Sequence, residues 1–314
     1  LFLARDGSGS GPAIPAAPPR SAAVVSHTGS GANANLQLPV TPLTEGRWYL
    51  TPVNTDASSA DIVIQATLTR TSPMATPRHG AFYNPARSGS GLFLFPLGEQ
   101  WGVIWYTYLE DGSPTWYIAA AAKPAGNAPV WVAPITRHVW NGVHDRPSVV
   151  GSMRLSVIDA NHLQFGFDVD GVAGSETLSA LPLPGCTTVS GQTASLDGFW
   201  YDPTFAGFGY SIVAGSAQRS VAAYLYDRSG IARWMLGAAG GTDNRISMLQ
   251  FSGFCPTCSY VPVLSAGAGS LVLAASQPNA AQFTLGVEWL PPLQGRWSVD
   301  HAVIKLGDNL SCTP

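Results

Sequence analysis

One segment of this chain occurs twice, and the duplication limits the possible fold more than any other feature of the sequence. Residues 82–91 read FYNPARSGSG, and residues 200–209 read WYDPTFAGFG. The second copy follows at an offset of 118 positions, as Tyr201 follows Tyr83, and the match continues without a gap. The offset is far longer than the roughly 20–50 residues of solenoid repeats, so each copy is predicted to be a domain of its own.

Each copy reads as a series of short β-strands. Segments rich in β-branched and aromatic residues are bounded by turn residues, and no segment shows a period of 3.6 residues. In the first copy we expect strands near 91–96, 101–109, 114–122, 129–136, 150–158, 162–169 and 176–182. Sequential strands with short turns predict an antiparallel meander, and closure as a small up-and-down barrel and a two-sheet sandwich are the two alternatives.

The repeated motif is interpreted first as a folding signature. Pro85 and Pro203 end a strand and fix a turn, where Asn84 and Asp202 can hydrogen-bond their own backbone. The second interpretation is functional, because large aromatic side chains with one polar tip can line a ligand cleft. The cleft residues would be Tyr106, Tyr108 and Trp116 in the first copy and Tyr224, Tyr226 and Trp234 in the second.

Some tryptophans of the first copy have no counterpart in the second. They are Trp101, Trp131 and Trp140. As exposed side chains they would form a platform for a polymer, with Trp101 and Trp131 as the main candidates. The alternative is burial in a barrel or in a domain interface.

Residues 1–71 differ from the repeats. They contain the low-complexity run GSGSGPAIPAAPPRSAA and strand-like segments at LFLARDG, 47–53 and 61–68. The predicted fold class is all-β, with an antiparallel β-sandwich-like N-terminal segment and two tandem antiparallel meander domains. The predicted organisation is a partial sandwich at 1–71, a linker at 72–79, one repeat at 80–185, a linker at 186–197 and the second repeat at 198–314.

Four cysteines allow three disulfide pairings. Cys255 and Cys258 form a CPTC segment, for which a zinc half-site, a redox pair and a local disulfide compete. A second close pair and a βαβ context are both missing, so the sequence favours the disulfide. Cys186 precedes the second repeat and Cys312 follows it, so a bridge between them would join the ends of that domain. Two disulfides indicate an oxidising compartment.

Composition excludes some classes of function. Only 11% of the residues are charged, the net charge is −3 and the basic residues are scattered, so no nucleic-acid partner is expected. No run of 18 apolar residues occurs, so no membrane-spanning helix is expected. The opening LFLARDG reads as the middle of a strand, and we expect further residues upstream of Leu1.

No motif for catalysis or for cofactor binding is visible. The six histidines form no HExxH, and neither a GxSxG elbow nor a complete calcium loop occurs. The positions that the two copies share are mainly Gly, Pro, Tyr, Trp and Gln, which serve packing. The sequence therefore predicts no catalytic residue, no metal and no cofactor, and it favours a non-enzymatic role without deciding the question.

The repeat resembles a known glycine- and aromatic-rich pattern, GxWYNPxxSGxG followed by WYTYxxxGxPxW. This pattern occurs in secreted or surface proteins of proteobacteria. Here the first copy reads GAFYNPARSGSG with WYTYLEDGSPTW, and the second reads GFWYDPTFAGFG with AYLYDRSGIARW. The second copy departs from the pattern at Asp202, Ala206, Ala223 and Ala232. The resemblance covers about 40 residues of each copy, implies an exported bacterial protein and brings no catalytic residues.

The N-terminal segment resembles the later strands of the bacterial pre-peptidase C-terminal domain. The likeness rests on LQLPVTPLTEGRWYLTPVN and the neighbouring DIVIQATLT. It implies a small β-sandwich whose first strands are missing here, which would leave unpaired strand edges. Another polypeptide could then pair with those edges by β-strand addition.

These observations together predict a secreted or cell-surface protein with a structural role. The first hypothesis is an assembly protein, such as a subunit of an extracellular filament or surface layer. It would associate with itself, or with another extracellular protein, by strand addition. The alternatives are a carbohydrate- or polymer-binding accessory module of an exported enzyme, and a secreted hydrolase whose site is not visible in the sequence.

Overall fold

The structure, a computed structural model, describes residues 74–125, 128–183, 185–205 and 207–311. Of the chain before residue 74 it describes three strands, β1 (Phe2–Arg5), β2 (Val25–Ser26) and β3 (Trp48–Thr51). The chain divides into two compact units, Leu1–Thr71 and Ser72–Pro314. Each unit is described by itself below.

The first unit contains a small antiparallel sheet in the order β2-β1-β3. The strands predicted at LFLARDG and within 47–53 are therefore confirmed. The predicted strand at 61–68 and the low-complexity run lie outside the described residues. The partial β-sandwich and its missing strands stay predictions.

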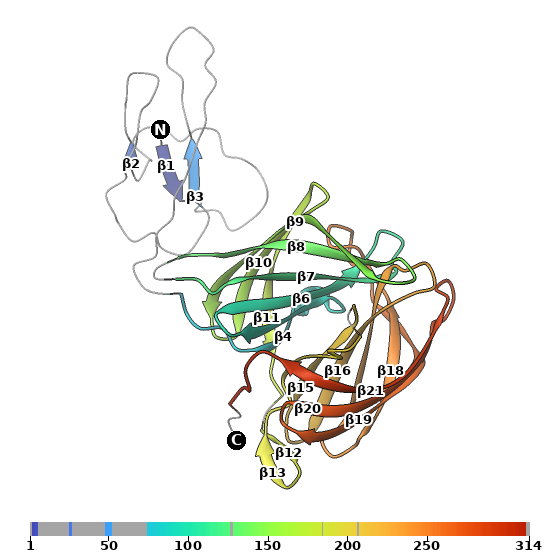
Figure 1. The fold of residues 1–314 in the computed structure, drawn as a ribbon. Helices are drawn as coiled ribbons and strands as arrows, with labels where there is room; N and C mark the ends of the chain where they lie inside the picture. Colours follow the sequence, from blue (N-terminus) through green and yellow to red (C-terminus); the bar gives the residue numbers. More distant parts are fainter. Residues whose placement is uncertain are drawn as a thin grey trace. The chain divides into compact units, whose positions relative to one another are not determined.

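The first repeat forms a closed barrel of antiparallel strands (Figure 1). Each strand pairs with the next one in the sequence, and the last strand returns to pair with the first, with Ser179 opposite Tyr83. The strands are β4 (Gly80–Tyr83), β5 (Gly91–Leu97), β6 (Gln100–Tyr108), β7 (Pro114–Ala122), β8 (Trp131–Trp140), β9 (Asp145–Asp159), β10 (His162–Val169) and β11 (Val172–Leu181).

The second repeat forms a second closed barrel with the same order of strands. Its last strand pairs with its first, with Ile304 opposite Tyr201. The strands are β14 (Gly198–Tyr201), β15 (Gly209–Ala214), β16 (Gln218–Tyr226), β17 (Ala232–Gly240), β18 (Arg245–Ser252), β19 (Leu264–Gln277), β20 (Ala280–Glu288) and β21 (Arg296–Leu306). The all-β class is confirmed, and of the two alternatives for each repeat the barrel is correct.

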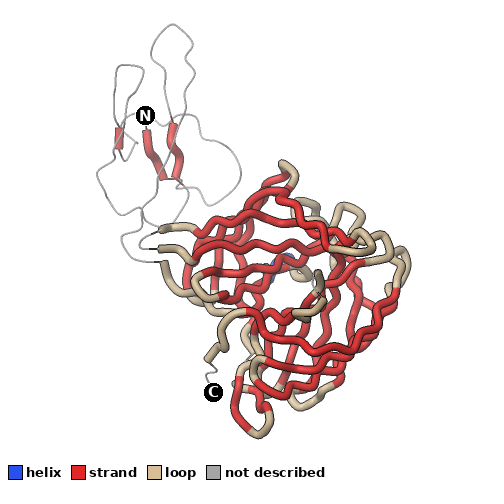
Figure 2. Tube along the Cα trace, in the orientation of Figure 1, coloured by secondary structure: helices blue, strands red, loops and turns tan. Residues whose placement is uncertain are grey.

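Loops and turns make up little of the barrel walls (Figure 2). One short 3₁₀ helix, η2 (Pro85–Arg87), follows β4 and begins at the proline of the repeated motif. In the chain segment that connects the two repeats, part of the predicted linker 186–197 forms a hairpin of β12 (Thr187–Val189) and β13 (Gln192–Ala194).

Side chains fill the lumen of each barrel. In the first barrel the ring of Trp105 lies 5.4 Å from Tyr117, 5.2 Å from Phe165 and 4.7 Å from Phe167, measured between centroids. In the second barrel Phe283 packs against Trp200 and Tyr210. A barrel of about eight strands is just wide enough for inward side chains to meet, so both interiors are packed cores.

Candidate functional site

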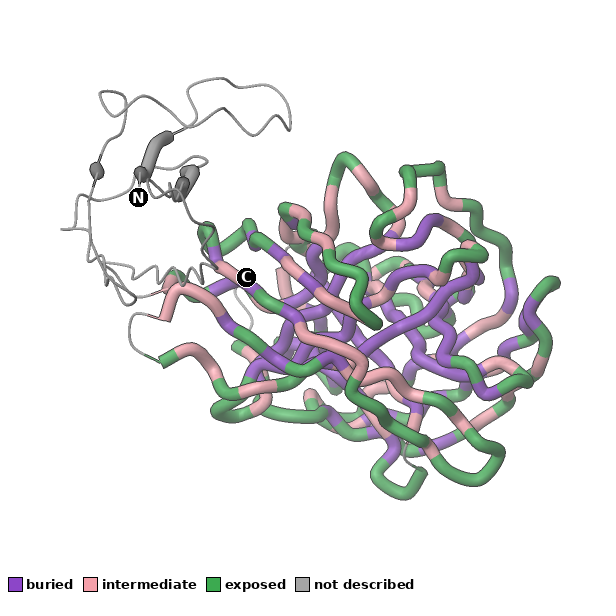
Figure 3. Tube along the Cα trace, turned by 90° about the horizontal axis from the view of Figure 1, so that it is seen from above, coloured by how far each residue is buried: buried purple, intermediate pink, exposed green. Residues whose placement is uncertain are grey.

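The aromatic residues of the repeated motif meet between the two barrels. Strands β6 and β7 of the first barrel face β16 and β17 of the second, and the residues between them form one buried cluster. Figure 3 shows buried residues gathered in the interior of the unit Ser72–Pro314. The indole nitrogen of Trp116 donates to the carbonyl oxygen of Leu225 at 3.3 Å, and that of Trp234 donates to Thr107 at 2.8 Å. Each contact is the other displaced by 118 positions, so the same surface of each repeat is used on both sides of the interface.

Ring contacts repeat this relation. Tyr106 lies edge-on to Trp234 with centroids 5.2 Å apart, and Tyr224 lies edge-on to Trp116 at 5.7 Å. Edge-to-face pairs of buried aromatic rings contribute roughly 0.5–1.5 kcal/mol beyond the area that they bury. The repeated aromatic residues therefore hold one barrel against the other.

Two further tyrosines tie the interface to the Gly–x–Gly turns. The hydroxyl of Tyr108 donates to the carbonyl of Gly89 at 2.8 Å, and that of Tyr226 donates to Gly207 at 2.6 Å. Gly89 and Gly207 both have positive φ angles, of 120° and 110°, which glycine adopts without strain. The spacing of the motif is explained by this bond, which joins a turn to the strand behind it.

Burial governs the protonation of these phenols. Loss of solvent raises the pKa of Tyr106, Tyr108, Tyr224 and Tyr226 above the usual value of a tyrosine. They stay neutral at every physiological pH. They act here as packing groups and hydrogen-bond donors.

The predicted binding residues are thus buried, except Tyr106, which is partly buried. The six cleft residues lie in the cluster between the barrels, while Trp101 and Trp131 lie in the lumen of the first barrel. The interpretation of Trp101 and Trp131 as an exposed platform is wrong, since their exposed fractions are 7% and 2%. Trp140 is half-buried and packs on Phe205 and Tyr226 of the second barrel. The alternative, burial in a barrel or a domain interface, is correct.

Charged residues cross the same interface, and sequence reasoning missed them. Arg233 pairs with Asp227 at 2.8 Å and donates to the hydroxyl of Ser113 and the carbonyl of Pro114 in the other barrel. Arg87 donates to the carbonyls of Pro256 and Cys258, and its guanidinium lies 4.9 Å over the ring of Phe254. Only 11% of the residues are charged, so an arginine close to the aromatic motif in each copy could have indicated these contacts.

The Asn/Asp position of the motif fastens the first strand of each barrel to the last. The side chain of Asn84 accepts from the backbone of Ala86 at 3.0 Å and donates to Glu176 on β11 at 2.9 Å. Asp202 accepts from the backbone of Thr204 at 2.8 Å and pairs with His301 on β21 at 3.1 Å. The sequence predicted the local backbone bond but not the reach to the closing strand.

In the second barrel the network continues into the core. The other ring nitrogen of His301 lies 2.9 Å from the hydroxyl of Tyr210, and all three side chains are buried. Burial by itself raises the pKa of Asp202, but hydrogen bonds from Thr204 and His301 outweigh it and the pKa is lowered. The carboxylate is therefore ionised and fully hydrogen-bonded, which suits a structural bond better than a nucleophile or a base.

The cysteine predictions are resolved in part. Cys255 and Cys258 form a disulfide, as predicted. Cys186 is also in a disulfide, but Cys312 lies outside the described residues, so the bridge from Cys186 to Cys312 stays a prediction. Among the residues that the structure describes, no three or more His, Cys, Asp or Glu side chains gather closely enough to hold a metal ion.

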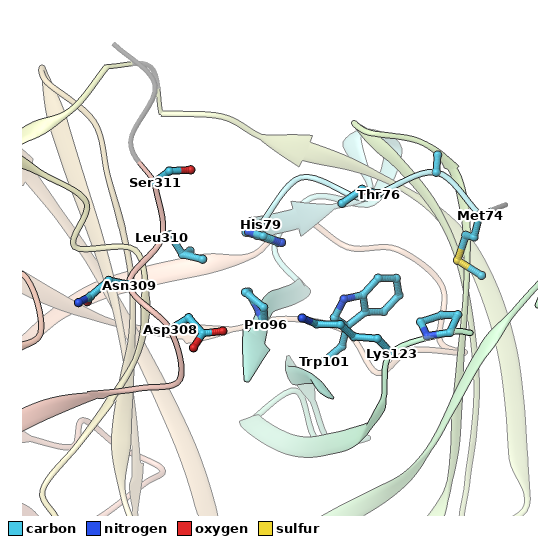
Figure 4. Close-up of a pocket in the computed structure, with 12 residues that line it drawn as sticks. Met74, Thr76, His79, Pro96, Trp101, Lys123, Asp308, Asn309, Leu310 and Ser311 are labelled. Atoms are coloured by element: carbon cyan, nitrogen blue, oxygen red, sulfur yellow. The ribbon is translucent and has the colours of Figure 1, made fainter. Parts of the chain in front are cut away.

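A pocket of about 550 Å³ lies at one end of the first barrel (Figure 4). Its walls come from residues 74–79, from the ends of β5, β6 and β7, and from residues 308–311 after β21. Among the eight predicted binding residues, Trp101 alone lines this pocket. The segments are far apart in the sequence, so no local pattern could have predicted it.

Comparison of this chain with protein families, with curated proteins and with solved structures gave no match. The resemblances of the repeat and of residues 1–71 therefore stay predictions. In the described part of the chain, no helix has the length and apolar character needed to cross a membrane.

Proposed function

We propose that this chain is a non-catalytic structural or assembly protein of the cell exterior. The observation that carries the proposal is the use of the repeated motif. Its aromatic residues pack one barrel against the other, and side chains fill the lumen of each barrel. A duplicated module of this kind serves as a preformed block rather than as a pair of ligand containers.

Rigidity supports the proposal. The two barrels are joined by hydrogen bonds in both directions, by crossed aromatic pairs and by buried arginine contacts. A subunit of a filament or surface layer has to keep its shape under load, and packed cores transmit force with little deformation. The disulfide between Cys255 and Cys258 fits an oxidising compartment outside the cytoplasm.

The joint between subunits is assigned to the first unit. Its described sheet, in the order β2-β1-β3, is antiparallel and small, and the resemblance of residues 1–71 implies a sandwich that lacks strands. A strand from a second copy, or from another extracellular protein, would complete it by main-chain hydrogen bonds. The unit Ser72–Pro314 would then be the repeating block.

Negative-stain electron microscopy of the secreted protein under non-reducing conditions tests the proposal. We expect regular fibres or sheets, and we expect them to disappear when residues 1–71 are removed. Dispersed single particles of the full chain, at concentrations where the protein is secreted, would refute the assembly role. A matched control is the Val149→Ala variant, which changes an exposed side chain of the first barrel and should leave any fibres intact.

A further inference from the structure

The pocket beside the first barrel has one cationic corner. The ammonium of Lys123 and the imidazole of His79 both line it, and neither side chain makes a hydrogen bond or ion pair with any residue that the structure describes. Lys305, the other lysine of the chain, donates to the carbonyl of Ser195 at 2.8 Å. Lys123 is thus a half-buried cation in a cavity, without a hydrogen-bond or ion-pair partner among the residues that the structure describes.

Lys123 affects the protonation of His79. Burial, and then the charge of Lys123, lower the pKa of His79. The imidazole is therefore neutral at pH 7. It can donate or accept a hydrogen bond while Lys123 supplies the positive charge.

The walls of the pocket differ in character. Figure 4 shows Trp101 and Lys123 on one side and residues 308–311 on the other, with His79 and Pro96 between them. Its apolar lining residues include Met74, which is half-buried, and Trp101 and Pro96, which are themselves buried and expose little surface. The opposite side carries the hydrogen-bonding groups of Asp308, Asn309 and Ser311, and Thr76 lies on the side of Trp101.

We propose that this pocket binds a saccharide unit that carries a carboxylate. A sugar ring is apolar on its face and hydroxylated at its edge, which matches a pocket lined by both apolar side chains and carboxylate, amide and hydroxyl groups. The carboxylate of the sugar would pair with Lys123, with His79 as a second hydrogen-bonding group. The volume of about 550 Å³ lies within the roughly 300–1,000 Å³ of small-molecule sites and far exceeds the size of a bare anion.

This site does not depend on the proposed assembly role. Binding is measured on the full chain in solution, dispersed or assembled, and its failure would leave the electron-microscopy result untouched. The probe is trigalacturonate, an acidic oligosaccharide. Galactotriose serves as the neutral analogue, and inorganic phosphate serves as the bare anion.

Isothermal titration calorimetry compares the native chain with Lys123→Gln. We expect trigalacturonate to bind with one site per chain and Lys123→Gln to weaken it about tenfold or more. The matched control is Arg154→Gln, which removes an exposed positive charge from β9 and should leave the affinity within twofold. Asn309→Ala, at an exposed residue of the opposite wall, should weaken binding without changing the thermal midpoint.

Several outcomes would overturn the proposal. Absence of binding at millimolar trigalacturonate would remove the site. Equal binding of galactotriose, or an unchanged affinity in Lys123→Gln, would remove its acidic specificity. Phosphate binding as tightly as trigalacturonate would show a simple anion site without a place for the sugar.

Discussion

The two barrels share one fold but close it with different chemistry. Glu176 lies three residues before Ser179, which pairs with Tyr83, and His301 lies three residues before Ile304, which pairs with Tyr201. The two residues are therefore equivalent partners for the Asn/Asp position of the motif. The first barrel closes with a partly buried amide–carboxylate bond, whereas the second closes with a fully buried network.

This difference separates what the fold requires from what it tolerates. Both barrels keep the glycines, the prolines and the interface aromatics at the same offset, but the closing pair changes from Asn84 and Glu176 to Asp202 and His301. Packing and turn geometry therefore specify the barrel. The polar bond between first and last strand needs only a donor and an acceptor in reach.

The largest effect is expected at the interface, where the two repeats are equivalent. Trp116→Ala and Trp234→Ala each remove a side chain that is 2% exposed, together with one hydrogen bond to the opposite barrel. We expect each to lower the free energy of unfolding by about 3–5 kcal/mol. Urea denaturation followed by far-UV circular dichroism measures it.

The control for this pair is Val149→Ala, at a side chain that is 70% exposed, which should change the unfolding free energy by less than about 0.5 kcal/mol. Costs for the two tryptophans that differ by more than about 2 kcal/mol would contradict the equivalence of the two sides.

The closing residues should differ in cost. Asp202→Ala leaves the buried His301 ring without its acceptor, and we expect a loss of about 3 kcal/mol. Asn84→Ala removes a partly buried bond to Glu176 and a backbone cap, for which about 1 kcal/mol is expected. Thermal unfolding of both variants checks the order. Equal losses of stability in the two variants would show that burial of the network around Asp202 does not make it more stabilising than the Asn84 bond.

Sensitivity to alkaline pH should also separate the barrels. Burial lowers the pKa of Lys305 on β21 from 10.5 to about 8, and the Asp197 carboxylate only partly opposes it. Between these two values the unfolded chain still holds the proton that the folded chain has released, so the free energy of unfolding rises with pH. In the first barrel the register places Ala180, which does not titrate, at the equivalent position.

Urea denaturation from pH 7 to just below pH 10 tests this assignment. We expect the free energy of unfolding to rise with pH in the native protein and not in Lys305→Met. The control variant Arg154→Gln should show the same rise as the native protein. The range ends there because tyrosines, which ionise near pH 10 when unfolded, then contribute with the opposite sign. A flat profile in the native protein would mean that Lys305 keeps its ordinary pKa.

The sequence predicted the strands well because their signals are local. Closure is a pairing between residues about 100 positions apart, such as Tyr83 and Ser179, and no local pattern distinguishes it from a sandwich. The repeated motif also showed which aromatic residues form the cluster. It did not show that the aromatic residues of one barrel pack against those of the other. The strand QWGVIWYTY is apolar on both faces, whereas a strand with one face in water alternates between apolar and polar residues. This sign of burial on both faces was overlooked.

The two faces of that strand contact two different clusters of buried residues. Val103 and Trp105 point into the lumen cluster, while Ile104 and Tyr108 belong to the cluster between the barrels. A strand of a small barrel that is buried on both faces has to be covered by another element. The second copy of the repeat provides that cover, so the two apolar faces of β6 alone are enough to predict the interface between the barrels.

The smallest effect concerns one repeat position that uses different chemistry in the two barrels. Arg87 and Phe205 are equivalent at the repeat offset, and each reaches the opposite barrel. Arg87 binds carbonyls of the turn closed by Cys255 and Cys258, whereas Phe205 packs on Trp140. We expect Arg87→Gln and Phe205→Ala each to lower the unfolding free energy by about 1 kcal/mol.

Coupling to the disulfide distinguishes the two contacts. Removing the disulfide by a double Cys→Ser change at 255 and 258 frees the turn whose carbonyls Arg87 holds, so the cost of Arg87→Gln should fall by about 0.5 kcal/mol or more in that background. The cost of Phe205→Ala should stay the same, because the ring of Phe205 packs on Trp140 and Phe208. Equal coupling of both residues to the disulfide would mean that the turn supports the whole interface rather than the arginine contact alone.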